Sequence, residues 1–463
     1  MSAAPGAAER PGAGGAIADY FKFAERGTDL WTEVRGGLTT FMVMVYIVFV
    51  NASILSAGFG LDATGATAIS AATALIAGIM TIAMGVVGNY PFALAAGLGI
   101  NAIVAFGLTA RGLTPEGAMG VIVLEGVAVT VLVLVGLREA VMNAVPLALK
   151  RAIGAGIGLF ILFIGFANGG LVGGQESSYG SVPAVFVRFP TEPAQFVFLF
   201  GLALTIILWA RRIRAALVIS ILVTTIVALF AGVATVPTDL SLTPNFSTLG
   251  RFDLTNVFTT LGLLTAVLVI FAIMLTDFFD TMGTVTGVAA EAGLARKDGS
   301  VPGTGRVLLV DSLGAVAGGL AGTSSNTTYI ESAAGVAEGA RTGFASVVTG
   351  VLFLLAIFLA PLAGIIPGVA TAPALVLVGY LMFTQVREIN VSDLEDGFPA
   401  LLTIILMPLT YEISVGIGAG FISWVLIKLV RGKFAEIHPL MWAVSVAFVI
   451  FFGQNWIEPL LPR

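Results

Sequence analysis

Long runs of uncharged, mostly apolar residues recur along almost the whole chain and restrict it to a membrane fold. One of them, residues 257–275, contains no charged side chain. A helix rises about 1.5 Å per residue, so about 20 such residues cross the roughly 30 Å of bilayer hydrocarbon. With 57% hydrophobic and 11% charged residues, the chain cannot cover soluble domains with polar surface. The alternation typical of a transmembrane β-barrel is absent, so we predict an all-α polytopic protein embedded in a lipid bilayer.

Fourteen apolar segments form two sets of seven. We predict the first set at residues 36–57, 67–87, 91–108, 115–137, 148–172, 194–210 and 215–233. We predict the second set at residues 262–288, 304–321, 324–339, 342–366, 368–386, 398–411 and 412–431. The predicted repeats are therefore residues 36–233 and 262–431.

The two ends of the chain are expected to lie outside these repeats. Residues 1–35 are predicted as a cytoplasmic tail, with the first twenty disordered and a short interfacial helix or a solvated linker at 18–35. Residues 432–463 are predicted as a C-terminal hydrophobic or interfacial segment. Within it, residues 439–453 are short for a span, so spanning, re-entrant and interfacial positions all stay open.

The positive charges agree with this map and suggest an inverted repeat. With a cytoplasmic N-terminus, 18 of the 22 Lys and Arg residues fall on the cytoplasmic side. Only Arg111, Arg188 and Arg251 fall on the outer side, and Arg463 depends on the last segment. Two units of seven spans enter the membrane from opposite sides, which is the inverted repeat of many secondary transporters. We expect a cell membrane location.

Several kinds of site are excluded by residues that the chain lacks. It contains no Cys and one His, which removes disulfides, thiol catalysis and thiolate metal sites. His438 alone, expected at the membrane interface, does not make a metal centre. No basic cluster of the kind that binds nucleic acid occurs. We therefore expect no enzyme activity, metal, cofactor or nucleic-acid partner.

Two aspartates follow the uncharged run in "TDFFDTMGTVTG". At helical spacing Asp277, Asp280 and Thr284 share one face. An acid at bilayer depth costs about 2.5–3.5 kcal/mol on insertion scales, so this face points to a polar interior, a partner or a proton. The alternative is an acid that only ends the helix or binds a backbone amide. Asp277 fits that alternative about as well as it fits a site.

The third and tenth spans are short and rich in small residues, which fits interrupted spans that form a transport site or, as the alternative, tight helix packing alone. In the tenth, Glu331 lies among hydroxyl and amide side chains, which include Thr327, Thr328 and Ser332. The carboxylate could accept ring N–H groups of a planar heterocycle, while hydroxyls meet its carbonyl or ring nitrogens. The alternative is a structural acid paired with Arg341 or another helix.

Three further polar residues in the spans are weaker candidates for the site. Asn101 in the third span offers both a donor and an acceptor, and either a site or a structural role fits it. Asn51 is expected to be structural, and Asp311 is expected near the cytoplasmic rim.

Three motifs carry a family resemblance. "GLGINAIVAF", "DFFDTMGTVTG" and "GTSSNTTYIESAAGVAEGARTG", in this order, resemble the signatures of the AzgA-like purine permeases, the hypoxanthine, guanine and adenine branch of the nucleobase:cation symporters. The similarity runs from about residue 18 to 453. It implies fourteen spans in two inverted seven-helix repeats. It also implies core and gate domains that each draw on both repeats, and half-helices with short strands at spans three and ten.

The resemblance also assigns residues to the site. It implies that Asp280 faces the base, Glu331 holds it, Asn101 is the polar residue of the third span, and Asp277 is a second acid near Asp280. Thr284 and the hydroxyls of Thr327, Thr328 and Ser332 complete the predicted substrate site. Relatives in the uracil and xanthine branches have a Glu where Asp280 stands.

These residues lead to a functional hypothesis. We expect a secondary active transporter that imports adenine, guanine or hypoxanthine by proton symport and alternating access. Asp280, Glu331 or Asp277 would carry the proton, and the sequence does not choose among coupled acids. The alternatives are a uracil or xanthine transporter, an anion transporter of the same fold, and a channel. A homodimer is possible by analogy with related folds.

Overall fold

The apolar runs of the sequence form helices in the computed structural model, which describes residues 15–136, 144–176, 183–237, 243–296 and 300–453. Ten helices in this part are long and apolar enough to cross a membrane. The first repeat contains α3 (Leu30–Met44), α4 (Ile47–Phe59), α5 (Ala63–Ala83) with the π-helical turn η1 (Met84–Gly88), α7 (Pro115–Leu134), α9 (Leu147–Asn168), α10 (Pro193–Ala210) and α11 (Ala216–Phe230).

The second repeat has the same order of elements. It contains α12 (Leu254–Glu291), α13 (Thr304–Ala321), α15 (Gly343–Ala356) with η3 (Ile357–Gly364), α16 (Gly368–Phe383) with η4 (Thr384–Glu388), α17 (Leu394–Thr410) and α18 (Ile413–Val430). The predicted spans lie within a few residues of these helices. The first begins earlier than predicted, at Leu30, and α12 begins at Leu254 and is interrupted at Gly262, where φ is 72°.

Spans three and ten are interrupted, as the resemblance implied. Span three consists of β1 (Leu94–Ala96), α6 (Leu98–Ala102) and the π-helical turn η2 (Ile103–Leu108), and span ten of β4 (Asn326–Thr328) and α14 (Ser332–Ala337). The two strands pair antiparallel, with Ala95 opposite Thr327. All six strand residues are buried, so each strand satisfies backbone groups that the other leaves open.

Polar side chains at the helix starts explain several boundaries. The Asp29 carboxylate accepts the amides of Trp31 and Thr32 before α3, and Asp253 caps α12 in the same way. Thr114 caps α7, where Pro115 occupies the first helical position. Each cap satisfies amides that have no partner inside the helix.

Glycines bring helices from different repeats into close contact. On α5 and α15, a Cβ at Gly78 would lie 2.9 Å from the Gly350 carbonyl oxygen, and one at Gly350 only 2.6 Å from that of Gly78. The helices that correspond to them by the repeat, α13 to α5 and α7 to α15, pack on each other through Gly319 and Gly126. Small residues allow this close approach where lipid supplies no hydrophobic driving force between helices.

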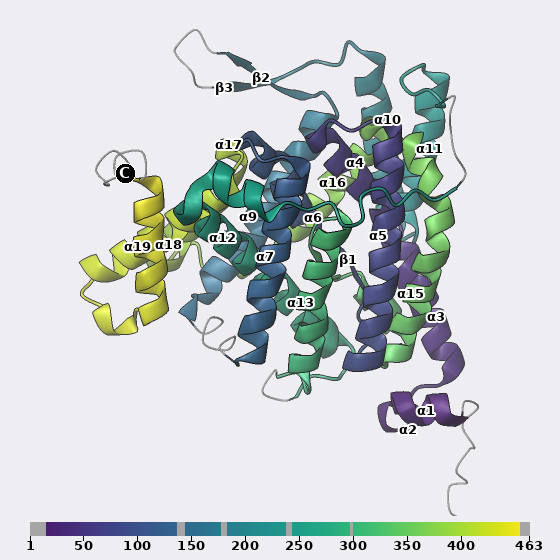
Figure 1. The fold of residues 1–463 in the computed structure, drawn as a ribbon, viewed down its shortest axis with the longest axis horizontal. Helices are drawn as coiled ribbons and strands as arrows, with labels where there is room; N and C mark the ends of the chain where they lie inside the picture. The colour runs from purple at the N-terminus through teal and green to yellow at the C-terminus, as the bar shows by residue number, and fades with distance from the viewer. Residues whose placement is uncertain (1–14, 137–143, 177–182, 238–242, 297–299, 454–463) are drawn as a thin grey trace, which may run out of the picture.

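Elements that are not part of the spans lie at opposite ends of the bundle (Figure 1). Helices α1 (Gly15–Phe21) and α2 (Phe23–Arg26) project at one end, and a hairpin of β2 (Val172–Glu176) and β3 (Pro183–Val187) at the other. The predicted disorder of the first twenty residues is wrong from Gly15 onward, because α1 is helical and Phe21 packs against Phe344. Residues 1–14 lie outside the described part. The hairpin was not predicted, since its Gly-rich first strand carries no clear alternation.

The C-terminal segment forms a short η5 (Phe434–Glu436) and α19 (Pro439–Phe452), which packs on α18. His438 caps α19, since its ring nitrogen accepts the Leu440 amide at 3.2 Å. Residues 454–463 lie outside the described part. Fourteen helical residues rise about 21 Å, at about 1.5 Å each, which is short of the roughly 30 Å of hydrocarbon.

The glycine contact between α5 and α15 makes a testable prediction. Gly350→Ala is expected to lower the thermal unfolding midpoint in detergent, because overpacking a core costs about 1–3 kcal/mol. Gly305→Ala on α13 is the matched control, since a Cβ there meets no atom within 4 Å. Equal midpoints for the two variants would show that the close contact does not limit stability.

Candidate functional site

Two acids from different spans lie in the same neighbourhood, next to the paired strands β1 and β4. Asp280 lies on α12, and Glu331 directly precedes α14. Asp280 is close enough to Glu331 and Asp311 for their charges to repel. Asp280 and Glu331 are both only partly buried, whereas Asp277, one turn earlier on α12, is 1% exposed. Both acids therefore keep accessible surface, and their role in a common substrate site stays a prediction.

The accessible face of α12 continues toward the C-terminal end of the helix. A Cβ at Gly283 would meet no atom within 4 Å, and one at Gly287 would meet only Ile330, at 3.9 Å. Ile330, the neighbour of Glu331, is 55% exposed. We call the accessible surface formed by Asp280, Glu331, Gly283, Gly287 and Ile330 the acid crevice.

The carboxylate of Glu331 has a specific partner. The hydroxyl of Tyr46 donates to Glu331 Oε1 at 2.8 Å. The alternative pairing with Arg341 is not observed, because that guanidinium donates to the carbonyl oxygens of Val336 and Ala340. Glu331 is thus attached to the first span.

The hydroxyls around Glu331 are engaged in joining the two interrupted spans to their neighbours. Thr327 pairs with the hydroxyl of Thr281 at 2.7 Å. The Ser332 hydroxyl accepts the backbone amide of Ala93 at 3.0 Å. Thr328 donates its hydroxyl to Asp311 Oδ1 at 2.8 Å. Their substrate-binding role stays a prediction.

Asp311 lies deeper than predicted. The expected place near the cytoplasmic rim is wrong, because the residue is 4% exposed in the middle of α13. Its Oδ1 accepts the amide and the hydroxyl of Thr328, at 2.9 and 2.8 Å, and its Oδ2 accepts the Thr281 hydroxyl at 2.8 Å. The carboxylate joins α13, α12 and β4, so this acid is well satisfied.

A further acid, Glu125 on α7, was not among the residues predicted from the sequence. It is fully buried, and neither of its oxygens accepts a hydrogen bond from a donor in the described part of the chain. Its carboxyl group is within hydrogen-bonding reach of Asp277, whose other contact is the Ser325 hydroxyl at 3.3 Å. Contact between two carboxyl groups is favourable when a proton lies between them. A single acid inside an apolar run was the signal that could have found it.

The remaining polar candidates are buried near the strands. Asn101 on α6 is fully buried, and neither amide atom has a hydrogen-bond partner in the described residues. The hydrogen bond that a purely structural Asn101 would make is therefore not seen. Thr284 on α12 is 7% exposed. Asn51 is structural, as predicted, since it donates to the Thr73 hydroxyl and the Thr323 carbonyl.

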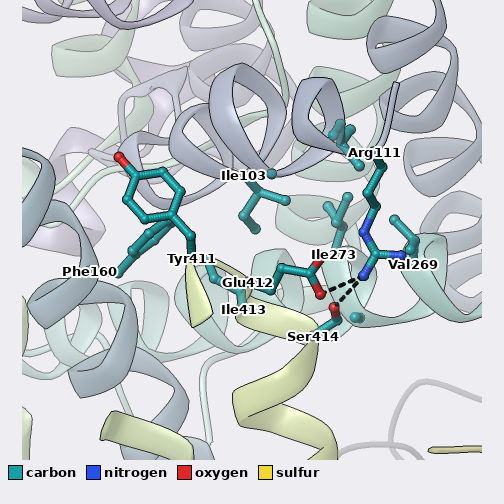
Figure 2. Close-up of a pocket in the computed structure, with 12 residues that line it drawn as sticks. Ile103, Arg111, Phe160, Val269, Ile273, Tyr411, Glu412, Ile413 and Ser414 are labelled. Atoms are coloured by element: carbon teal, nitrogen blue, oxygen red, sulfur yellow. Dashed lines mark hydrogen bonds and ion pairs between the residues drawn. The ribbon is translucent and has the colours of Figure 1, made fainter. Parts of the chain in front are cut away.

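A small cavity lies beside η2, at the C-terminal end of span three (Figure 2). Its volume is about 20 Å³, which is room for about one water molecule. Arg111, which follows η2, donates to Glu412 Oε2 at 2.6 Å, and the hydroxyl of Ser414 lies 3.4 Å from the same nitrogen. The cavity is too small for a heterocycle, and the ion pair joins span three to the start of α18. Among the described residues, no group of three or more acids or histidines could hold a metal.

Comparison with known proteins places this geometry in a family. The Permease family (Xan_ur_permease) matches residues 32–419. The guanine/hypoxanthine permease PbuG of Bacillus subtilis is 39% identical over 444 residues, which covers 94% of this chain and 98% of that protein. The adenine permease AdeP of Escherichia coli is 39% identical over 438 residues, covering 94% and 96%. The nucleobase transporter PlAzg2 of Paenibacillus larvae is 33% identical over 404 residues, covering 86% and 78%.

Solved structures give the same fold at much lower identity. The transmembrane domain of the cyanobacterial bicarbonate transporter BicA is similar, with a TM-score of 0.61 and 15% identity over 84% of this chain and 97% of that one. The anion transporter SLC26A9 from mouse also has a TM-score of 0.61, with 12% identity over 87% and 69%. These domains share the architecture of two inverted seven-span repeats, which confirms the predicted fold class.

The contrast between Asp311 and Glu125 makes a testable prediction. Asp311→Ala is expected to destabilise the protein by about 3 kcal/mol or more, because each buried donor left without its acceptor costs about 1–3 kcal/mol. Glu125→Gln is expected to cause little loss, since this acid accepts no hydrogen bond from a described donor and a Gln amide can still donate to Asp277. Thermal unfolding in detergent measures both. A larger loss for Glu125→Gln would contradict this division.

Proposed function

Because the chain belongs to the Permease family, we propose that it is a secondary active transporter that imports the purine nucleobases adenine, guanine and hypoxanthine. Its relatives are named as permeases and transporters, and the chain is a permease rather than an enzyme. The names of the relatives, several of them guanine/hypoxanthine or adenine permeases, support the purine substrate.

The acid crevice is the observation that supports a nucleobase most directly. Asp280 and Glu331 are acceptors, they are partly accessible, and no cation is paired with either carboxylate among the ion pairs of the described residues. A purine presents ring and exocyclic N–H groups that such acceptors bind in the plane of the ring. Asn101, with both amide atoms unpartnered in the described part, would offer a donor and an acceptor from the third span.

The same acids argue against the competing substrates. The solved structures of the same fold include a bicarbonate transporter, yet two carboxylates at one site repel an anion. The named relatives favour purines over uracil or xanthine. A channel fits poorly, because a pore more naturally arises from oligomeric symmetry than from two inverted repeats.

The buried acids supply a route for proton symport. A carboxyl group inside the membrane can take a proton on the outside and release it inside, and the charge change alters its affinity for a base that binds beside it. Asp280 and Glu331 are the acids that would meet the base. Asp277, one turn before Asp280 on α12, and Glu125 on α7 are buried more deeply, and this pair would share one proton.

Alternating access would need one group of spans to move against the other. We assign spans 1–4 and 8–11 to the core and spans 5–7 and 12–14 to the gate, because α9, α10, α11, α16, α17 and α18 pack mainly on one another. Two ion pairs cross this boundary: Arg111 with Glu412, and Arg214, before α11, with Glu338 at the end of α14. Movement of the core past the gate separates such pairs.

The spans that carry these two pairs correspond to each other in the inverted repeats. Spans three and fourteen carry the Arg111 pair, and spans ten and seven the Arg214 pair. From the distribution of positive charge in a protein of the cell membrane, we infer that the N-terminus lies in the cytoplasm. The Arg111 pair then faces outward and the Arg214 pair faces the cytoplasm. A homodimer stays a prediction by analogy with related folds.

Uptake into proteoliposomes tests the substrate and the acids together. With an imposed proton gradient, the native protein is expected to take up radiolabelled hypoxanthine, guanine or adenine, and Asp280→Asn and Glu331→Gln each to lose about tenfold or more, since a hydrogen bond to a charged group contributes about 1.5–3 kcal/mol. Asp253→Asn is the matched control, because it changes an acid on the same helix at a cap that Asn fills equally well.

Each failure of this experiment has its own meaning. Normal uptake by both acid variants would remove them from the site. Movement of only uracil, xanthine or an inorganic anion would contradict the purine substrate, and purine uptake that ignores the gradient would contradict proton coupling.

Cross-linking tests the movement of the core against the gate. The chain contains no Cys, so Arg111→Cys combined with Glu412→Cys gives one pair of thiols for a short, reducible bis-thiosulfonate reagent. Uptake by this double variant is expected to stop after cross-linking and to return after reduction, because the boundary can no longer open. The two single variants, treated in the same way, control for simple labelling. Unchanged uptake by the cross-linked protein would contradict opening at this place.

A further inference from the structure

Tyr46 lies where the first span is interrupted, far in sequence from the acid crevice. It separates α3 from α4, at a point where the amide of Phe49 bonds to the Tyr46 carbonyl in a tight turn. Its side chain is 0% exposed. The sequence does not mark this tyrosine, because an aromatic residue in an apolar span is usual.

The hydroxyl of Tyr46 has an unusual partner for a buried tyrosine in this protein. It donates to the carboxylate of Glu331 at 2.8 Å across 285 residues of sequence. The neighbouring Tyr329, also buried, donates instead to the backbone carbonyl of Ala96 in β1. Tyr329 therefore binds one of the paired strands, and Tyr46 binds the acid of the crevice.

This hydrogen bond restricts what Glu331 can offer to a ligand. Oε1 is engaged with Tyr46, and the residue as a whole remains partly accessible, so Oε2 is the oxygen left for a ligand in the crevice. A long, flexible acid held in this way loses less freedom when a ligand binds. A planar ligand with an N–H donor needs its acceptor at one place in the plane of the ring, and a fixed carboxylate provides it.

We propose that Tyr46 is a positioning residue that orients the Glu331 carboxylate toward an N–H group of the bound nucleobase and thereby contributes to substrate selectivity. The inference rests on the proposed function and deepens it. Tyr46 acts through Glu331 and adds no contact of its own to the base.

Kinetics with matched substrates test this role. Uptake of hypoxanthine and of its 1-, 7- and 9-methyl derivatives is measured for the native protein, Tyr46→Phe and Tyr329→Phe. Each methyl group removes or blocks a different edge of the ring. Tyr46→Phe is expected to raise the KM for hypoxanthine about tenfold, with kcat within about twofold, because a hydrogen bond that orients a charged group is lost.

The selectivity ratio separates positioning from a structural effect. The ratio compares hypoxanthine with the methyl derivative that the native protein takes up least well. In Tyr46→Phe this ratio is expected to shrink, because the misplaced Oε2 no longer accepts the hydrogen bond of the N–H group that the methyl group replaces. Tyr329→Phe removes an equally buried hydroxyl from the same neighbourhood, and it is expected to leave this ratio as in the native protein. Tyr46→His, which keeps a ring and a donor, is expected to recover part of the ratio.

The outcomes distinguish this inference from the proposed function. Purine uptake by the native protein with an unchanged ratio in Tyr46→Phe would overturn the positioning role while the function stands. An equal change in both tyrosine variants would make the effect structural and would also overturn it. If Tyr46→Phe does not fold, the ratio is read in Tyr46→His against Tyr329→Phe. If the native protein takes up no purine, both proposals fall.

Discussion

The pairing of β1 with β4 is the interaction on which the rest of the structure depends. Two spans that break inside the membrane expose backbone amides and carbonyls where no water can satisfy them. Three residues from each repeat solve the problem for each other, with Leu94 opposite Thr328 and Ala96 opposite Asn326. The free-energy cost of backbone groups without a hydrogen-bond partner makes the pairing of β1 with β4 obligatory. Because α6 and α14 come soon after the strands, this pairing also fixes where Asn101 and Glu331 lie.

The acids around this crossing differ in how well the protein satisfies them. Asp311 accepts three hydrogen bonds and holds the strand to two helices. Glu125 accepts none from the described residues, and Asp280 and Glu331 retain accessible surface. Natural proteins leave polar groups poorly satisfied mainly at functional sites, where a ligand or a proton completes them. Asp311, which is satisfied by three hydrogen bonds, therefore maintains the fold, whereas Asp280 keeps accessible surface on which the proposed function depends.

Packing inside the two groups of spans differs from packing between them. Glycines bring backbones together within a group, as Gly158 and Gly379 do between α9 and α16, where an added Cβ would lie 2.7 Å or less from the opposite carbonyl oxygen. Across the proposed core and gate boundary, contacts include ion pairs and the hydrogen bond between the Ser53 and Thr371 hydroxyls. Close backbone packing resists rearrangement, whereas polar contacts near an accessible cavity can exchange with water. This difference is what two bodies that move against each other require.

The sequence by itself determined the two sets of seven spans and their approximate limits, and it pointed to the third and tenth spans as interrupted. Those features follow from hydrophobic length and from small residues, which are local properties of the chain. It also marked Asp280 and Glu331 as candidates, because an acid within a membrane span stands out whether it follows an apolar run or lies among hydroxyl side chains. Only the tertiary structure decided that Asp311 is satisfied, that Glu125 meets Asp277 and that Tyr46 holds Glu331. Each of these depends on a partner on another span, and the choice of partner depends on how the helices pack, which no local pattern of residues records.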